Sequence, residues 1–83
     1  DIIKLTKDDS GLVRTCAYGA IGHIGTKKGI KELHKGIFDS NIEAVKSAAY
    51  ALIRIGERLS EKEIKKLDKF NDPDFKKILK FLD

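Results

Sequence analysis

The segment Val13-Arg-Thr-Cys-Ala-Tyr-Gly-Ala-Ile-Gly-His-Ile-Gly25 decides the architecture of this chain, because a variant of it returns about thirty residues later. The second copy reads Ala44-Val-Lys-Ser-Ala-Ala-Tyr-Ala-Leu-Ile-Arg-Ile-Gly56. Each copy opens with an apolar residue, has small residues in its middle, and closes with Ile-Gly. A repeat of this length is typical of a solenoid, in which each unit buries its apolar face by stacking on the next.

The composition indicates one small folded domain. The chain has 83 residues, of which 41% are hydrophobic and 36% are charged, as in ordinary globular proteins. A formal net charge of +4 gives a mild preference for an anionic partner. The apolar runs are far shorter than the roughly 20 residues that span a bilayer. The single cysteine excludes an internal disulfide. We therefore expect a cytoplasmic protein that does not enter a membrane.

Apolar residues at helical spacing, interrupted by glycine and proline, predict helices throughout the chain. Residues 1–7 are expected to be the end of a preceding helix. The next helix is expected to begin after an N-cap at Ser10 and to stop at Gly25. Its predicted apolar face consists of Leu12, Val13, Cys16, Ala17, Ala20, Ile21 and Ile24.

Three further helices and a cap are expected after Gly25. A polar link over residues 26–29 leads into the second helix of the first repeat. Capping boxes at Ser40–Glu43 and Ser60–Glu63 are predicted to open the two helices of the second repeat. The last helix, within residues 71–83, is expected to cap the C-terminal end with a lysine-rich outer face. The predicted core of the second helix consists of Ile30, Leu33 and Ile37, with Phe38 at its margin.

The repeated segment resembles a HEAT repeat of the short kind first noted in phycobilisome lyases. The first copy matches the family pattern at Asp9, Val13-Arg14, Ala17, Ala20-Ile21-Gly22 and Ile24-Gly25. The second copy matches at Ala48-Ala49, Ala51-Leu52 and Ile55-Gly56, and departs at Ala44-Val45 and Ile53.

The resemblance implies an all-α fold, a right-handed α-α superhelix of about two helical-hairpin repeats with a C-terminal capping helix. Residues 1–83 would then form one HEAT-like domain, with repeat one at 8–38, repeat two at 39–70 and the cap at 71–83. It also implies that Asp9 and Arg14 bridge adjacent repeats.

No group of residues in the chain specifies a reaction. A zinc or iron site needs three or four converging ligands, whereas His23 and His34 are eleven residues apart without a paired cysteine. We therefore expect no metal, no cofactor and no catalytic residue. Cys16 is expected to be a small packing residue. Tyr18 and Tyr50 each follow an alanine and are expected to pack between helices, with a stacking platform for a ligand as the alternative.

Two rows of lysines are the best candidates for a binding surface. In each predicted repeat they lie on the second helix, opposite its apolar side, and the resemblance implies that these helices line a concave surface. Acidic residues are interleaved with the lysines of residues 57–83, so a solvated helix face is the alternative reading. The candidate partner- or anion-binding residues are Lys28, Lys31, Lys35, Lys62, Lys65, Lys66 and Lys69.

These observations favour a non-catalytic protein–protein interaction or scaffold module. Its partner is expected to be another protein or further repeats of the same parent chain. Two alternatives stay open: a nucleic-acid-binding module that grips phosphates through the lysine rows, and an accessory subunit of an enzyme such as a lyase. Because the apolar face near residues 1–7 has no polar cover in the sequence, self-association through the N-terminal end is also expected.

Overall fold

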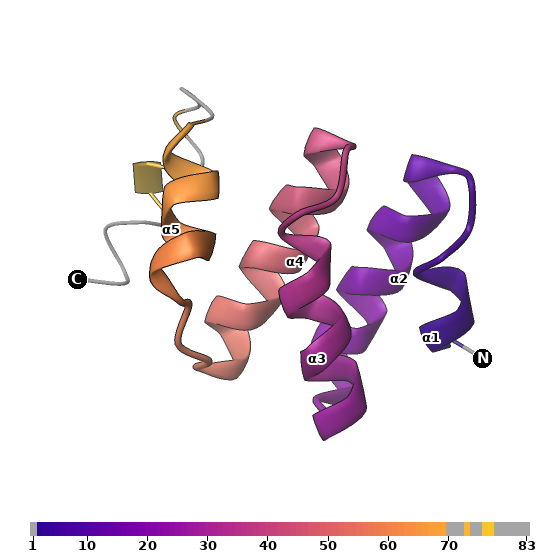
Figure 1. Ribbon diagram of the computed structural model, residues 1–83. Coiled ribbons are helices and arrows are strands. Elements are labelled where there is room, and N and C mark those ends of the chain that lie inside the picture. The colour runs from indigo at the N-terminus through magenta and orange to yellow at the C-terminus, as the bar shows by residue number, and fades with distance from the viewer. Residues whose placement is uncertain (1, 70–72, 74–75, 78–83) are drawn as a thin grey trace.

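All the regular secondary structure in the part that the structure describes is helical. The computed structural model describes residues 2–69, 73 and 76–77. Within these residues it has no strand and five helices, α1 (Ile2–Leu5), α2 (Gly11–Ile24), α3 (Lys27–Gly36), α4 (Ile42–Ile55) and α5 (Glu61–Asp68) (Figure 1). The prediction of an all-α chain is confirmed. Most of the predicted capping helix, 71–83, lies outside the described residues.

Local capping chemistry sets most helix ends. The Ser10 hydroxyl accepts a hydrogen bond from the Val13 amide, which satisfies one of the free amides at the start of α2. Helices α2 and α4 end at Gly25 and Gly56, whose φ angles of 67° and 87° lie in the left-handed region that favours glycine. These three ends agree with the prediction, and so does the capping box at Ser60.

Two predicted helix starts were wrong. Helix α4 is capped by Asn41 rather than Ser40, because the Asn41 side chain accepts hydrogen bonds from the amides of both Glu43 and Ala44. Helix α3 already begins at Lys27, with Thr26 as its N-cap, so the predicted polar link is the first turn of this helix.

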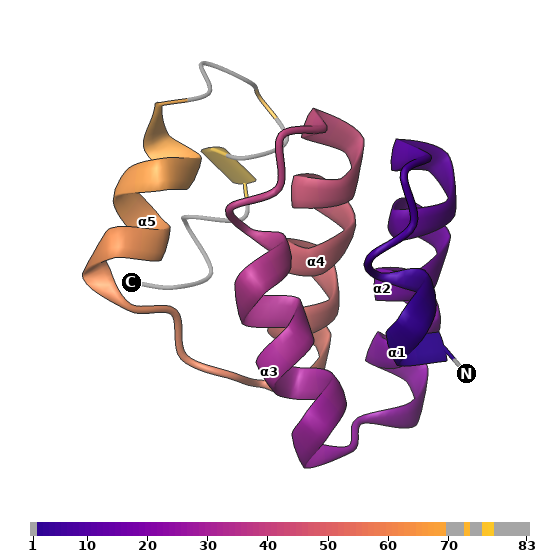
Figure 2. The same ribbon diagram turned by 45° about the vertical axis from the view of Figure 1, so that its right-hand side comes forward.

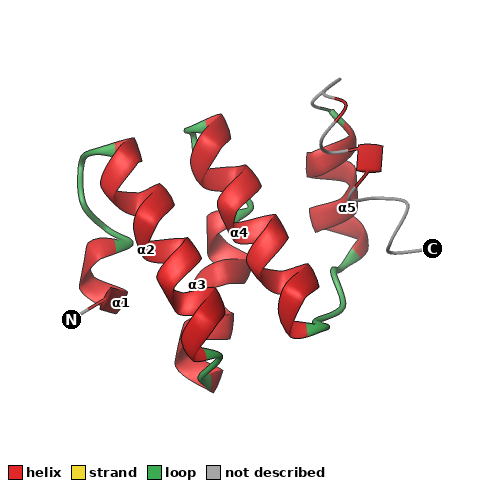
Figure 3. Ribbon diagram, turned by 180° about the vertical axis from the view of Figure 1, so that it is seen from behind, coloured by secondary structure: helices red, strands yellow, loops and turns green. Residues whose placement is uncertain are grey.

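The helices form two layers around a shared core. Helices α2 and α4 lie side by side, as the view from behind shows (Figure 3), and α3 packs against both of them on the other side. Helix α1 lies beside α2, while α5 follows α4 at the far end of the molecule (Figure 2). This arrangement places α3 and α5, the carriers of the lysine rows, outside the α2–α4 layer.

Small residues set the close approach of these helices. A Cβ atom on Gly22 would lie 2.7 Å from Cβ of Ala51, and a Cβ on Gly36 would lie 2.8 Å from Cβ of Ala48. Both distances are too short for real side chains, so glycine is required for α2 and α3 to reach α4. The buried core consists of Ala17, Tyr18, Ile21, Leu33, Ile37, Ala44, Val45, Ala48, Ala49, Ala51, Leu52 and Leu67.

The predicted apolar face of α2 was partly wrong. Leu12 is 74% exposed, and Ile24 and Cys16 are also exposed. Tyr18, which was not counted in the predicted apolar face, is buried, as expected for a residue that packs between helices. The core of this helix is therefore rotated away from Leu12 and Cys16, and those two residues belong to an open surface described below.

Two turns of the structure recur at the spacing of the sequence repeat. Placing Val13 on Ala44 sets a register of 31 residues (44 − 13), and we call residues 8–38 unit one and residues 39–69 unit two. In this register, the end of α1 falls on the end of α3. The turn after α1 is closed by amides of Lys7 and Asp8 bonded to carbonyls of Lys4 and Leu5, and the turn after α3 by the equivalent bonds from Phe38 and Asp39 to Lys35 and Gly36.

Candidate interaction surfaces

The lysines of α3 lie on the outer side of that helix. Leu33 is fully buried against α2 and α4, and the three candidate lysines of this helix are exposed on the opposite side. Lys35 Nζ lies 3.4 Å from Glu32 Oε1, one turn away on the same helix. The exposed lysines of this row are Lys28, Lys31 and Lys35.

The lysines of α5 are arranged in the same way. Leu67 and Glu63 are buried, and the candidate lysines lie on the other side of the helix. Lys62, Lys65 and Lys69 are exposed, whereas Lys66 is half-buried. The structure thus places six of the seven candidate lysines in solvent, on two helices.

A histidine–carboxylate cluster joins α3 to α5. His34 Nδ1 lies 2.6 Å from Oε2 of the buried Glu63, and His34 Nε2 lies 3.4 Å from Oε1 of Glu57. Carboxylate oxygens only accept hydrogen bonds, so both contacts are hydrogen bonds only when both ring nitrogens carry a proton. This cluster fixes the two lysine-bearing helices as neighbours.

The surroundings of His34 favour its charged form. Partial burial of the ring opposes the charge, but the hydrogen bonds and negative charges of Glu63 and Glu57 outweigh it, so the pKa of His34 is raised. Sequence reasoning missed this cluster. His34 was considered only as a metal ligand, and Glu63 was recognised only as part of the capping box. Helical periodicity alone does not reveal a contact between residues on different helices.

A second polar cluster holds unit one to unit two. Arg14 of α2 forms a bidentate ion pair with Asp39, with Nε–Oδ2 and Nη2–Oδ1 distances of 2.8 and 3.0 Å. Its Nη1 atom donates to the carbonyls of Asp8 and Asp9. The bridge expected between Asp9 and Arg14 therefore uses the backbone of Asp9, and the carboxylate comes from Asp39.

Burial and charge shift the pKa values within this cluster. Burial and the nearby Asp39 carboxylate raise the pKa of Tyr18 to about 12, and the Tyr18 hydroxyl donates to Asp39 over 3.3 Å. Burial opposes ionisation of Asp39, but the hydrogen bonds from Arg14 and the Asn41 amide lower its pKa. Asp39 is thus held as a carboxylate at the junction of the two units.

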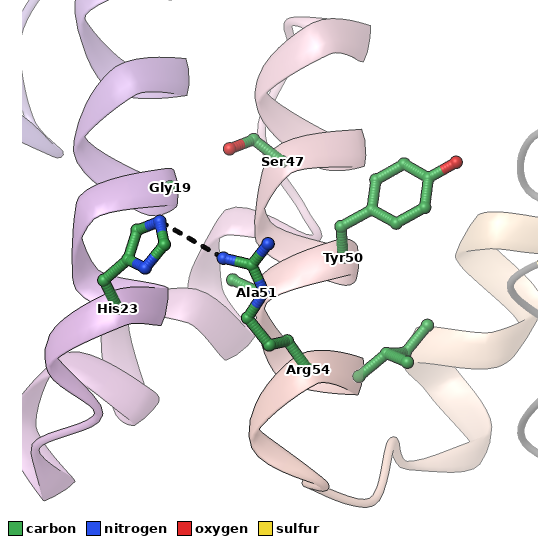
Figure 4. Close-up of a pocket in the computed structure, with 7 residues that line it drawn as sticks. Gly19, His23, Ser47, Tyr50, Ala51 and Arg54 are labelled. Atoms are coloured by element: carbon green, nitrogen blue, oxygen red, sulfur yellow. Dashed lines mark hydrogen bonds between the residues drawn. The ribbon is translucent and has the colours of Figure 1, made fainter.

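The outer side of the α2–α4 layer has a groove of about 520 Å³. Figure 4 shows Arg54 of α4 directed toward His23 of α2, and Arg54 Nη1 lies 3.2 Å from His23 Nε2. Tyr50 stands beside the groove and is 48% exposed, so the expectation that both tyrosines pack between helices was right for Tyr18 and wrong for Tyr50. The groove is lined by Gly19, His23, Ser47, Tyr50, Ala51, Ile53 and Arg54.

A third surface lies at the α1 end of the molecule. It is an apolar hollow of about 400 Å³ between α1 and α2, lined by Ile2, Leu5, Leu12, Val13, Cys16, Ala17 and Ala20. Cys16 is exposed at this surface, which corrects its prediction as a packing residue.

The described residues do not have the features of two other classes of site. No three histidine, cysteine or acidic side chains within the described ranges are grouped so that they could hold a metal ion. None of the helices described here has the length and apolar character needed to cross a membrane.

Comparison with known proteins does not assign the chain to a family. No protein-family model matches the chain, and no curated protein matches it significantly.

Proposed function

We propose that this chain is a non-catalytic interaction module of the HEAT-like α-solenoid type, and that it binds an acidic segment of another protein across α3 and α5. The observation that carries the proposal is the outward placement of six exposed lysines on these two neighbouring helices. The two-layer packing and the 31-residue recurrence of the turns support the solenoid part of the proposal.

The distribution of charge favours a protein over a nucleic acid. Glu32 Oε1 lies 3.4 Å from Lys35 Nζ, so a carboxylate stands within the α3 row, and Glu57 lies next to His34 between the two helices. A phosphate backbone presents negative charge at every step and is repelled by such carboxylates. An acidic protein segment can place its own neutral or basic side chains next to them, which is how complementary charge gives specificity.

The chemistry of the basic side chains in the two rows also favours a protein partner. They are all lysines, and lysine lacks the planar fork with which arginine clamps phosphates or reads bases. Nucleic-acid binding through the same lysines is the second candidate, because six exposed cations on adjacent helices also attract phosphates.

A binding measurement with paired charge reversals tests the proposal. The probes are a fluorescein-labelled glutamate-rich peptide and a labelled mixed-sequence DNA duplex, followed by anisotropy at two salt concentrations. Lys31→Glu with Lys65→Glu removes one cation from each row. The matched control is Lys7→Glu with Arg58→Glu, two exposed cations outside α3 and α5. Both pairs change the net charge equally.

We expect the Lys31/Lys65 pair to weaken peptide binding about tenfold, roughly 0.7 kcal/mol for each reversed charge, and the control pair to weaken it much less. An equal loss in both pairs would show attraction by net charge only and would contradict the proposed surface. Tighter binding of DNA than of peptide, with a steep linear salt dependence, would replace the proposal by the second candidate.

A further inference from the structure

We propose that the groove between α2 and α4 binds a small aromatic carboxylic acid, whose carboxylate pairs with Arg54. The groove lies on the outer side of the α2–α4 layer, and none of the candidate lysines of α3 and α5 lines it. Binding there is therefore independent of the partner proposed for those lysines.

Arg54 provides a positive charge that no carboxylate in the described part of the chain neutralises. None of the salt bridges among the described residues includes it. Its Nη1 atom lies 3.2 Å from His23 Nε2. Arginine only donates hydrogen bonds, so Nη1 donates to Nε2 and the proton of the neutral imidazole is on Nδ1. This contact holds the guanidinium between the two helices, where an anion can meet it.

The space of the groove depends on Gly19. In the 31-residue register Gly19 of α2 is equivalent to Tyr50 of α4. A Cβ on Gly19 would meet only Ser47 Oγ, at 3.6 Å, whereas a Cβ on Gly22 would lie 2.7 Å from Cβ of Ala51. The contact with α4 thus requires glycine at position 22 but not at position 19, although glycine inside a helix is destabilising relative to alanine. Gly19 leaves open a space that helix packing does not require, a feature of sites where binding limits stability.

The lining of the groove combines one charged group with apolar surface. Figure 4 shows the guanidinium of Arg54 directed toward His23, and the ring of Tyr50 directed away from His23. Ile53 adds to the apolar lining, and the exposed ring of Tyr50 offers a surface against which an aromatic ligand packs. The volume of about 520 Å³ lies within the range of small-molecule sites, roughly 300–1,000 Å³. A flat apolar molecule with one charged group fits this lining.

The charge of the groove selects a carboxylate. Among the described residues that line it, Arg54 is the one with a permanent positive charge. It balances a carboxylate, whereas a phosphate monoester carries a charge of about −1.5 to −2 at neutral pH. The planar guanidinium also matches the two oxygens of a carboxylate. The Nδ1–H of His23 is a further donor, whereas the Ser47 hydroxyl already donates to the Thr15 carbonyl over 2.8 Å.

An NMR titration of the labelled chain with naphthoate tests the proposal. We expect saturable amide shifts at Gly19, His23 and Arg54, with little change at Lys31 and Lys65. The neutral control ligand is naphthamide, which has the same ring system and no charge to pair with Arg54. We expect it to bind about tenfold more weakly than naphthoate.

Three variants separate the groove from the rest of the surface. Arg54→Gln removes the cation of the groove, and Arg58→Gln removes an exposed arginine outside it. We expect about tenfold weaker naphthoate binding for the first and less than about twofold for the second. Gly19→Leu places a side chain in the groove, so we expect it to abolish saturable binding while circular dichroism still shows a helical chain.

Equal weakening by Arg54→Gln and Arg58→Gln, or equal affinity for naphthoate and naphthamide, would overturn the proposal. The absence of saturable shifts in the groove at about 10 mM naphthoate would also overturn it. Tighter binding of naphthyl phosphate than of naphthoate would overturn the choice of a carboxylate. If Gly19→Leu does not fold, the two arginine variants still decide between these outcomes.

Discussion

Units one and two have the same register but differ where one helix meets the next. Unit one has Arg14 and Gly22 at positions where unit two has Val45 and Ile53. Gly22 lets α2 approach α4 closely, and Arg14 clamps the loop that begins unit two. Ile53 is larger than Gly22, and Val45, which is fully buried, has no charge with which to form an ion pair. The comparison teaches that the two units share their helix spacing but differ in the residues with which one unit contacts the next.

The largest effect is expected from the equivalent core residues Ile21 and Leu52, which are both buried. Truncation of either to alanine leaves a cavity, and we expect a loss of about 2–5 kcal/mol in the free energy of unfolding. In a domain whose total stability is roughly 3–5 kcal/mol, either variant is close to unfolded at room temperature. Urea denaturation followed by circular dichroism measures this.

Leu12→Ala is the control for these truncations. Leu12 lies on the open face of α2, so its loss is expected to cost less than about 0.5 kcal/mol, as for other surface positions. A large loss at Leu12 with small losses at Ile21 and Leu52 would mean that α2 has a different buried side.

The next largest effect separates the two equivalent aspartates. Asp39→Asn weakens the bonds from Arg14 and Tyr18, and we expect a loss of about 1–2 kcal/mol, whereas Asp8→Asn should cost a few tenths. The pKa of Asp39 is lowered in the folded chain. Its stabilisation is therefore present above the unfolded pKa of about 4 and is lost as the pH falls through the lower folded value.

Thermal melts of the wild-type chain and both aspartate variants between pH 2 and pH 6 measure this difference. The wild type and Asp8→Asn should both lose stability in acid, and their curves should approach that of Asp39→Asn. Parallel curves for all three proteins would contradict the role assigned to Asp39.

The two interior glycines of α2 are expected to respond with opposite signs. Gly22→Ala brings a Cβ to 2.7 Å from Ala51, so it should destabilise by about 1 kcal/mol or more. A Cβ on Gly19 would meet only Ser47 Oγ at 3.6 Å, an ordinary contact, so Gly19→Ala should stabilise by about 0.5–1 kcal/mol through helix propensity. Chemical denaturation of the two variants measures whether each substitution raises or lowers the free energy of unfolding. Changes of the same sign would mean that α2 contacts α4 through residues other than Gly22.

The smallest effect concerns His34. Its pKa is raised by Glu63 and Glu57 in the folded chain, so its stabilisation is complete below the unfolded pKa of about 6.5 and is lost as the pH rises through the higher folded value. Because the ring is partly exposed and screened, we expect only a few tenths of a kcal/mol. His34→Gln should flatten the dependence of stability on pH between 6 and 8. An unchanged slope would assign that dependence to another group.

Much of the fold follows from local signals in the sequence. Ser10, Gly25, Gly56 and Ser60 mark helix ends because capping depends on a few neighbouring atoms. Ser40 was wrongly predicted as the N-cap of α4, because the adjacent Asn41 is an equally good capping residue. The hydrogen bond from the Asn41 amide to Asp39 Oδ1 holds the turn in which Asn41 is the cap.

The features that the sequence did not predict depend on contacts between helices. Tyr18 and Tyr50 look equivalent because each follows an alanine, but in the 31-residue register Tyr18 falls on the buried Ala49 and Tyr50 on Gly19. The pairing of His34 with Glu63 depends on how α5 returns to α3, which helical periodicity does not encode. Six of the seven candidate lysines are exposed as predicted, because opposition to an apolar stripe is a property of one helix, whereas Lys66 is half-buried.

An NMR titration tests the central claim, that α3 and α5 present the partner-binding surface. The labelled chain is titrated with the glutamate-rich peptide at low and moderate salt, and the amide shifts are mapped along the sequence. We predict that the largest shifts cluster around Lys31 and Lys65, with little change at Gly19 and Tyr50 in the α2–α4 groove. Shifts confined to that groove or to the hollow beside Leu12, with none on α3 or α5, would contradict the claim.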